Sequence, residues 1–371
     1  MMRKHVFASV LWASLIAASA MVPRDLCSTV SFTLPVVALN GLFAAAPDSN
    51  NETQVQDFVR AVFSGTVVLP TGTQSVSSTF TINGVYCKPL LVKHNAVQLL
   101  VHGITYDKTY WSGLGFGKLY NYQGFASLNG YATLAIDRLG HGANSERPDP
   151  FTVVQAPVHV EIFHQLIYAI RSTSVNPLCR KFSKIAYIGH SYGSFLGAGL
   201  ARQYPTDIDT LVLTGYSTTL NVTTISNLHF VSASVLFPDR FNEPLGYVTD
   251  SQLSQREAAF YAGSYNRAIP LVDYHLEDTV TDGEAAGLVS LFQPSPAFSN
   301  PLLIITGVDD ALLCSPPLSS CLSLLAASGQ LFPNSTHFEY SAIPNTGHDL
   351  NLHYSAPVTF ARIHFFLDKY F

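Results

Sequence analysis

Ser191 lies in the stretch IGHSYGS (188–194), between two glycines in the pattern G-x-S-x-G. The apolar segment KIAYI lies just before this pattern, and the helix-like segment SFLGAGLARQ follows it. In a strand-turn-helix of this kind the serine stands at a sharp backbone corner, which exposes its Oγ and requires small neighbours. The first turn of the helix also presents free N–H groups, which favour a negative charge developing nearby. We therefore expect Ser191 to act as a nucleophile.

A serine hydroxyl is a weak nucleophile unless a histidine takes its proton and a carboxylate orients that histidine. When the nucleophile stands on such a corner, the acid follows it in the chain and the histidine comes last. Asp309 and Asp310 come soon after the apolar segment PLLII. His348 and His353 lie in the stretch NTGHDLNLH near the C-terminus. Both kinds of partner are therefore present in the required order, with two choices for each.

Acyl transfer passes through a tetrahedral intermediate whose oxyanion is bound by backbone N–H groups. One donor is expected to be Tyr192, which directly follows the serine. The second comes from the turn after the first core strand, and the stretch LLVHGIT supplies that turn. We therefore predict an oxyanion hole formed by Ile104 and Tyr192.

Apolar segments of strand length alternate with helix-like segments along most of the chain. The expected strands are 96–101, 132–136, 184–188, 210–213 and 301–305, and the clearest helices are 153–171 and 194–203. This alternation indicates an α/β fold with a mostly parallel central sheet flanked by helices. Ligands of such sheets bind beyond the carboxyl ends of the strands, where the serine and acid motifs fall.

Residues 217–299 interrupt the alternation, because the segment is too long for a simple crossover. It contains nine Asp and Glu, three Arg and no Lys, and it is rich in Phe and Tyr. We interpret it as a helical cap with solvated acidic faces, whose aromatic side chains pack together and in part line a pocket. The expected division is a signal peptide over 1–20, core over 21–216, cap over 217–299 and core again over 300–371.

The N-terminus has the pattern of a secretory signal peptide. Arg3 and Lys4 precede an uncharged apolar run, and the stretch ASA supplies the small residues that a signal peptidase reads, so we expect cleavage after Ala20. The alternative is an uncleaved anchor, although the run is short for a bilayer span. No later stretch has the pattern of a membrane span.

Sequons and cysteines fit a secreted or vacuolar glycoprotein. The pattern N-x-S/T occurs at Asn51, Asn221 and Asn334. All five cysteines follow the signal peptide, and in an oxidising compartment disulfides form readily. Two pairings suggest themselves, although the sequence does not fix them: Cys314 with Cys321 and Cys27 with Cys87, which leaves Cys179 over.

The sequence does not point to a metal, a cofactor or a nucleic acid. His159 and His164 flank Glu161 on an expected helix, but their spacing differs from the H-E-x-x-H zinc motif, so we interpret both as structural or surface residues. The formal net charge is −5, which leaves no broad basic surface for nucleic acid.

Taken together, five motifs resemble those of the α/β-hydrolase fold superfamily. The motifs are VHGITYDKTYW, IDRLGHGAN, GHSYGS, GVDDALLC and NTGHDLNLH, and they extend from Ala96 to near the C-terminus. Within that superfamily the chain more closely resembles secreted fungal lipase- and esterase-like serine hydrolases, in which HG is followed by an aromatic pair, here Tyr110-Trp111. A serine at the corner argues against relatives that use a carboxylate nucleophile on epoxides or halides. The absence of an HGGG loop argues against the hormone-sensitive-lipase-like branch.

The resemblance implies a role for each matching residue. His102 is implied to be structural, beside the oxyanion turn. Asp137, Arg138 and His141 in DRLGHG are implied to hold loops together, with substrate contact as the alternative for Arg138. The implied catalytic residues are Ser191 as nucleophile, His348 as base and Asp310, from the pattern G-x-x-D, as acid.

These residues predict hydrolysis of an ester or lactone of a hydrophobic small molecule or lipid, without a metal or an organic cofactor. Two other classes stay open. A secondary-metabolite tailoring enzyme would use the same site for lactone opening, cyclisation or a lyase-type step. A silent binding module would keep the fold without turnover.

Overall fold

The computed structural model describes residues 26–43, 47–64, 70–143, 145–172, 176–314 and 318–371. The predicted signal peptide over residues 1–20 lies outside these ranges. No helix within them is both long and apolar enough to cross a membrane.

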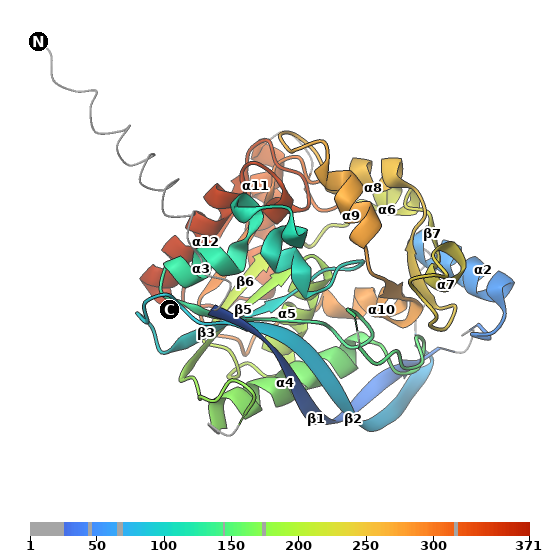
Figure 1. The fold of residues 1–371 in the computed structure, drawn as a ribbon, viewed down its shortest axis with the longest axis horizontal. Helices are drawn as coiled ribbons and strands as arrows, with labels where there is room; N and C mark the ends of the chain where they lie inside the picture. The colour runs from blue at the N-terminus through green and yellow to red at the C-terminus, as the bar shows by residue number, and fades with distance from the viewer. Residues whose placement is uncertain (1–25, 44–46, 65–69, 144, 173–175, 315–317) are drawn as a thin grey trace, which may run out of the picture.

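The core is an eight-stranded sheet with the strand order β1-β2-β4-β3-β5-β6-β10-β11 (Figure 1). Six strands, from β4 to β11 in this order, run parallel, and β2 runs antiparallel to both of its neighbours. The predicted α/β-hydrolase fold, with a mostly parallel sheet, is confirmed. The strands are β1 (Cys27–Leu42), β2 (Gly72–Cys87), β3 (Ala96–Val101), β4 (Ala132–Ile136), β5 (Lys184–His190), β6 (Thr210–Thr214), β10 (Leu302–Gly307) and β11 (Phe338–Ile343).

The five strands expected from the sequence are all present in this sheet. β3, β4, β5 and β6 begin at the predicted residue, and β10 begins one residue later than predicted. Apart from Lys184 at the start of β5, every residue of these five strands is buried. Parallel strands covered by helices on both faces are nearly continuous apolar runs, which is why the sequence located them.

Helices cover both faces of the sheet (Figure 1). On one face α3 (Tyr122–Leu128) packs with α12 (Ala356–Tyr370), and on the other α4 (Ala156–Ser172) packs with α5 (Tyr192–Gln203). The two helices predicted from the sequence are α4 and α5. A further helix, α11 (Leu318–Ser328), packs against β11. Short 3-10 turns cover Lys108–Gly115, Lys118–Tyr120, Leu288–Leu291, Gly329–Leu331 and Leu350–Leu352.

β1 and β2 form a long antiparallel pair of strands, with residues 43–71 between them, that the sequence analysis did not predict. Each strand has 16 residues, and β1 alternates between buried and exposed side chains over most of its length. That alternation is typical of a sheet with one face on the core and one in solvent. The buried face of β1 packs against α4. The β1–β2 pair thus extends the core sheet by two strands at one edge.

The cap, residues 217–299, contains the expected helices and also a small sheet that was not expected. The sheet has three antiparallel strands in the order β7-β8-β9. The helices are α6 (Val222–Ser226), α7 (Ala233–Leu236), α8 (Leu253–Phe260), α9 (Ile269–Leu276) and α10 (Asp282–Gly287), and the strands are β7 (Phe230–Ser232), β8 (Tyr247–Asp250) and β9 (Val280–Thr281).

An N-terminal helix, α2 (Glu52–Phe63), packs on the cap although it precedes it by about 150 residues in the chain. It contacts β7, α6 and α10, and Figure 1 shows it beside β7 and α7. Asn51 caps its N-terminus by accepting a hydrogen bond from the backbone of Gln54. The layer that covers the core therefore comes from two separate segments of the chain.

The prediction that the acidic residues of the cap are solvated is wrong for seven of the nine. Burying a carboxylate is costly unless donors surround it, and most of these carboxylates have such donors. Arg256, fully buried, donates two hydrogen bonds of 2.8 Å to Asp273 and lies 3.1 Å from Glu277. The buried acids are Glu243, Asp250, Asp273, Glu277, Asp278, Asp282 and Glu284.

The cysteines are paired as the sequence suggested. Cys27 and Cys87 form a disulfide between directly opposite positions of β1 and β2, and Cys314 and Cys321 form a second one. Cys179 is free and exposed. Two disulfides are compatible with a chain that folds in an oxidising compartment.

The two disulfides are expected to differ in how much they stabilise the chain. The sequence separations are 60 and 7 residues, and the entropy removed from the unfolded chain grows with loop length. Replacing Cys27 and Cys87 by Ser should lower the free energy of unfolding by about 4 kcal/mol, and replacing Cys314 and Cys321 by about 2 kcal/mol. Urea unfolding of both double variants measures this, and the reverse order would contradict it.

The Arg256–Asp273 ion pair is expected to hold the cap in its fold. The variant Asp273→Ala leaves the arginine charge buried without its main partner, so the free energy of unfolding should fall by about 3–5 kcal/mol. The control Asp239→Ala removes an exposed acid of the same cap and should change it by no more than about 0.5 kcal/mol. Equal effects of the two substitutions in urea unfolding would refute this role.

Candidate active site

Ser191 occupies the corner between β5 and α5, with φ 52° and ψ −120°. This backbone conformation is strained for a residue with a side chain. The corner is tightly packed, because a Cβ on Gly189 would overlap the backbone of Gly193, and a Cβ on Gly193 would overlap the carbonyl of Val101 in β3. The Ser191 N–H donates to the carbonyl of Thr214 at the end of β6, at 2.9 Å. The predicted strand-turn-helix is thus present, and both glycines are required sterically.

Asp310 and His348 are brought together from two different loops. Nδ1 of His348 lies 2.8 Å from Oδ2 of Asp310, and both side chains are buried. The hydroxyl of Thr306 donates to the same carboxylate at 2.8 Å, and the backbone N–H groups of Leu312 and Leu313 donate at 2.9 and 3.0 Å. Four donors on one carboxylate fix its position and favour its charged form.

The environment shifts the pKa values of this pair toward a charged couple. Burial raises the pKa of Asp310, but the charge of His348 and the hydrogen bonds outweigh burial, and the pKa lies below its usual value. Burial lowers the pKa of His348, but the charge of Asp310 outweighs it, and the pKa lies above that of an ordinary histidine. The aspartate therefore stabilises the imidazolium that a general base becomes.

The two rival residues are placed elsewhere. No hydrogen bond joins the side chain of Asp309 to a histidine in the described part of the chain. His353 uses both ring nitrogens: Nδ1 donates to the carbonyl of Asp349 at 2.8 Å, and Nε2 accepts from the N–H of Gly347 at 3.0 Å. The geometry thus favours Asp310 and His348 over these alternatives.

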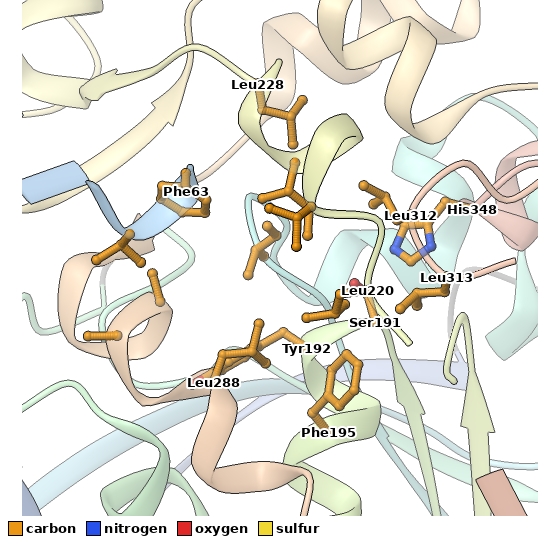
Figure 2. A pocket seen from close by; sticks show the side chains of 16 residues that line it. Phe63, Ser191, Tyr192, Phe195, Leu220, Leu228, Leu288, Leu312, Leu313 and His348 are labelled. Atoms are coloured by element: carbon orange, nitrogen blue, oxygen red, sulfur yellow. The ribbon is translucent and has the colours of Figure 1, made fainter. Parts of the chain in front are cut away.

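Ser191 and His348 line the same cavity, which has a volume of about 210 Å³ (Figure 2). The Nε2 atom of His348 has no hydrogen-bond partner in the described ranges, so it is free to accept a proton there. We call this space the Ser191 cavity. It is lined by Val62, Phe63, Ile104, Ser191, Tyr192, Phe195, Leu220, Val222, Ile225, Leu228, Ala285, Ala286, Leu288, Leu312, Leu313 and His348.

The two predicted oxyanion residues, Ile104 and Tyr192, also line the Ser191 cavity. Tyr192 is the first residue of α5, where a backbone N–H has no partner within the helix. Ile104 precedes Thr105, which has φ 56° and donates its N–H to the carbonyl of Thr279 in the cap at 3.1 Å. The cap therefore helps to hold the turn that presents the Ile104 N–H.

The expectation that part of the cap aromatics line a pocket is wrong for the Ser191 cavity. The cap contributes aliphatic side chains from α6, α10 and their flanking residues instead. Its aromatic rings pack against one another and against buried charges, for example Phe260 beside Arg256. The aromatic ring at the far end of the cavity is Phe63 of α2, which the sequence analysis did not single out. The ten cap aromatics that the lining omits are Phe230, Phe237, Phe241, Tyr247, Phe260, Tyr261, Tyr265, Tyr274, Phe292 and Phe298.

His190, which precedes the serine, is held as a neutral ring. The hydroxyl of Thr214 donates to the carbonyl of Gly189, so Nδ1–H of His190 donates to that hydroxyl at 3.1 Å. Burial, reinforced by the charge of His348, holds the pKa of His190 well below its usual value. Its Nε2 lies 3.1 Å from Oδ1 of Asp349, the residue after the candidate base. A neutral ring that donates from Nδ1 accepts at Nε2, so this contact requires a hydrogen bond donated by a protonated carboxyl group of Asp349.

Tyr106 supports the same protonation state of Asp349. Its phenol oxygen lies 2.5 Å from Oδ2 of Asp349 and 2.9 Å from Oδ2 of Asp273. A phenol carries one proton, so one of the two carboxyl groups must carry another. Burial raises the pKa of both carboxyl groups, but Asp273 also accepts two hydrogen bonds from the Arg256 guanidinium, which favour its charged form and leave Asp349 as the better place for the proton. These contacts favour the protonated form of Asp349, which would not compete with Asp310 for His348.

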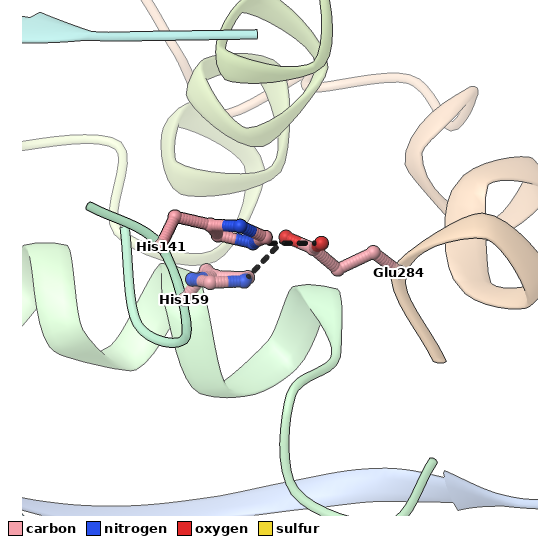
Figure 3. Close-up of side chains that lie close together, drawn as sticks. All are labelled: His141, His159 and Glu284. Atoms are coloured by element: carbon pink, nitrogen blue, oxygen red, sulfur yellow. Dashed lines mark hydrogen bonds and ion pairs between the residues drawn. The ribbon is translucent and has the colours of Figure 1, made fainter. Parts of the chain in front are cut away.

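Glu284 forms a second buried hub that joins the cap to the core (Figure 3). Its carboxylate contacts Arg138, accepts from Nε2 of His141 at 2.9 Å and of His159 at 2.8 Å, and accepts from the N–H of Thr281 at 2.9 Å. Burial raises the pKa of Glu284, but the charges of Arg138 and His141 outweigh it and hold the pKa well below its usual range. Four polar groups, one of them a guanidinium, thus surround this carboxylate.

The residues of the DRLGHG and HG motifs that the sequence analysis singled out form hydrogen bonds within the protein. His102 donates from Nδ1 to the carbonyl of Gly103 at 2.9 Å and accepts at Nε2 from the N–H of Arg138 at 3.0 Å. Asp137 accepts from the side chain of Lys108 at 2.6 Å. Arg138 is buried and does not line the Ser191 cavity, so its geometry matches loop attachment and not the alternative of substrate contact.

His164 is partly exposed and Glu161 is buried, and each pairs with a neighbouring side chain. Nδ1 of His164 lies 2.7 Å from Asp207, and Glu161 accepts from Gln165 at 2.8 Å. His159, in contrast, is fully buried, and burial lowers its pKa to about 4 despite the nearby charge of Glu284. These positions agree with the structural or surface interpretation of both histidines.

Comparisons with known proteins place the fold. The chain resembles the solved structures of E-2-(acetamidomethylene)succinate hydrolase (19% identity, 78% of this chain and 96% of that one, TM-score 0.52) and a thermophilic esterase from Thermogutta terrifontis (17%, 78% and 94%, 0.52). It also resembles a bromoperoxidase from Bacillus anthracis (17%, 78% and 96%, 0.53). At these identities the likeness establishes the fold alone.

No curated protein matches the sequence. A family model described as "Alpha/beta hydrolase family" matches residues 98–363, which is more than half of the chain. That range includes the serine corner, the Asp310–His348 pair, the oxyanion turn and the whole cap. The chain belongs to the alpha/beta hydrolase family.

Proposed function

We propose that this chain is a serine hydrolase that cleaves esters or lactones of apolar acids through an acyl-enzyme on Ser191. One observation carries the proposal. The strained serine corner and a buried Asp310–His348 pair with a free Nε2 open into one apolar cavity. Nucleophile, base and orienting acid are the three parts that such catalysis needs.

In the proposed first step, Nε2 of His348 takes the proton of Ser191 as Oγ attacks the ester carbonyl. Asp310 keeps Nδ1–H of the imidazole oriented and stabilises the imidazolium. The N–H groups of Ile104 and Tyr192 bind the oxyanion, aided by the positive end of α5. The imidazolium then protonates the leaving oxygen, and the alcohol departs.

In the second step a water molecule replaces the alcohol. His348 takes its proton, the resulting hydroxide attacks the acyl carbonyl, and the same two N–H groups bind the new oxyanion. Collapse returns the proton to Ser191 and releases the acid. The chain's own residues are sufficient for every proton transfer in this sequence.

Export of the chain is part of the proposal. The disulfides Cys27–Cys87 and Cys314–Cys321 support folding in an oxidising compartment, as the N-terminal signal pattern predicts. Asn51 is exposed at the start of α2, where a glycan would meet solvent. Reading the mature N-terminus and the glycan mass of the exported protein tests this part.

The nucleophile can be tested directly. Ser191→Ala should lower kcat for p-nitrophenyl esters by at least about 10³-fold, because the covalent route is lost. A fluorophosphonate probe should label the native chain at Ser191 and leave the variant unlabelled. Circular dichroism of the variant checks that the fold is retained. Equal turnover by both proteins, or labelling at another residue, would rule out the proposed mechanism.

The pH dependence follows from the shifted pKa of His348. A general base works only when it is neutral, so kcat/KM should be low in acid and rise with pH through the pKa of His348. Asp310 raises that pKa, so the midpoint should lie above about 6.5, the value of an ordinary histidine. Asp310→Asn should lower the pH of this midpoint, and it should lower kcat by about 10⁴-fold. A flat profile between pH 5 and pH 9 would exclude His348 as the base.

A further inference from the structure

We propose that the Ser191 cavity holds the acyl chain of the substrate, an aliphatic chain, and that Phe63 of the N-terminal helix α2 sets its maximum length. The inference rests on the proposed function for the position of the reacting carbonyl. It adds a substrate class and a specificity-determining residue outside the region that the family model matches.

The composition of the cavity lining points to hydrocarbon. Among the described residues that line it, the polar side chains are Ser191, His348 and Tyr192, and none is charged apart from the titrating histidine. The hydroxyl of Tyr192 faces the carbonyl of Glu284, at 3.4 Å, and is buried. A hydroxyl or charged group carried into this space would lose its water without gaining partners, which is costly. An alkyl chain loses nothing of this kind and gains apolar contact.

The position of His348 separates the acyl side of the ester from the alcohol side. The leaving oxygen takes its proton from His348 and must therefore lie next to that ring. Figure 2 shows His348 and Phe63 at opposite ends of the cavity, with Ser191 nearer to the histidine. The substituent that extends from the carbonyl toward Phe63 therefore points away from the leaving oxygen. That substituent is the acyl chain.

The far wall of the cavity is made by α2. Val62 and Phe63, the last two residues of this helix, line it there. The Phe63 ring stacks on Phe230 of β7 with ring centroids 4.2 Å apart and planes at 27°. Phe230 is buried, so the ring of Phe63 is supported from behind by the cap. A chain that reaches this ring cannot extend further without displacing it.

Two ester series separate the acyl chain from the alcohol. The first varies the acyl chain of p-nitrophenyl esters from C2 to C16, and the second varies the alcohol of alkyl acetates over the same lengths. The variants are Phe63→Ala, which lengthens the cavity, and Phe63→Trp, which shortens it. The matched control is Phe58→Ala: Phe58 lies on the same helix and is buried against Phe151, but it does not line the cavity.

The expected result is a shift confined to the acyl series. Phe63→Ala should move the optimum to longer chains, with kcat/KM for long esters raised about fourfold for each methylene that enters the new space, and the alkyl acetate series should keep its dependence on alcohol length. Phe63→Trp should move the optimum to shorter chains. Phe58→Ala should keep the native profile even where it lowers stability.

Three results would overturn the inference while leaving the proposed function intact. They are a shift in the alkyl acetate series alone, no shift in either series, and equal shifts from Phe58→Ala and Phe63→Ala. If the native chain cleaves no ester, the proposed function fails, and binding of C6 to C16 fatty acids to Ser191→Ala by calorimetry becomes the test. A length limit that Phe63→Ala removes in that assay supports the chain-binding cavity, and the lack of any length limit refutes it.

Discussion

The backbone corner at Ser191 is the constraint on which the rest of the structure depends. Its positive φ is tolerated because the surrounding strands fix the chain on both sides. β3 presses against the corner so closely that Gly193 has no room for a side chain, and β6 binds the Ser191 N–H through Thr214. The order β3-β5-β6 in the sheet is thus a requirement for the corner as well as a route for the chain.

The cap is attached to this core by buried charges. Arg256 joins Asp273 and Glu277 within the cap and donates to the hydroxyl of Thr105, beside the oxyanion turn, at 2.8 Å. Glu284 joins the cap to Arg138 on the core side. Buried ion pairs gain little net stability, because desolvation offsets their attraction, but a charge left without its partner is costly. Such contacts therefore permit one arrangement of cap and core and penalise others.

Local patterns in the sequence predicted the centre of this structure well. The five central strands are mostly apolar and almost wholly buried, and the motifs around Ser191 and Asp310 follow two of them directly. The β1–β2 pair and the position of α2 were not predicted, because both depend on contacts with distant segments. The burial of the cap acids was missed for the same reason: Asp273 meets Arg256 from another helix, and Glu284 meets histidines about 125 and 143 residues away. The number of acidic residues in the sequence suggested solvent exposure, because composition contains no information on which distant residues are their partners.

Positioning and substrate selection are carried by different chemistry in this chain. The hydrogen bonds and ion pairs around Asp310, Asp349 and Glu284 are directional, and the loss of one leaves a buried polar group without a partner. The walls of the Ser191 cavity are mostly apolar, and apolar contact is non-directional and proportional to area. A change of volume at Phe63 alters which chain fits without breaking a hydrogen bond that orients His348. The cavity lining and the catalytic groups meet at Ser191 and Leu312, but apolar contact sets the size of the cavity, whereas hydrogen bonds set the catalytic geometry. The size of the cavity can therefore vary independently of the catalytic geometry.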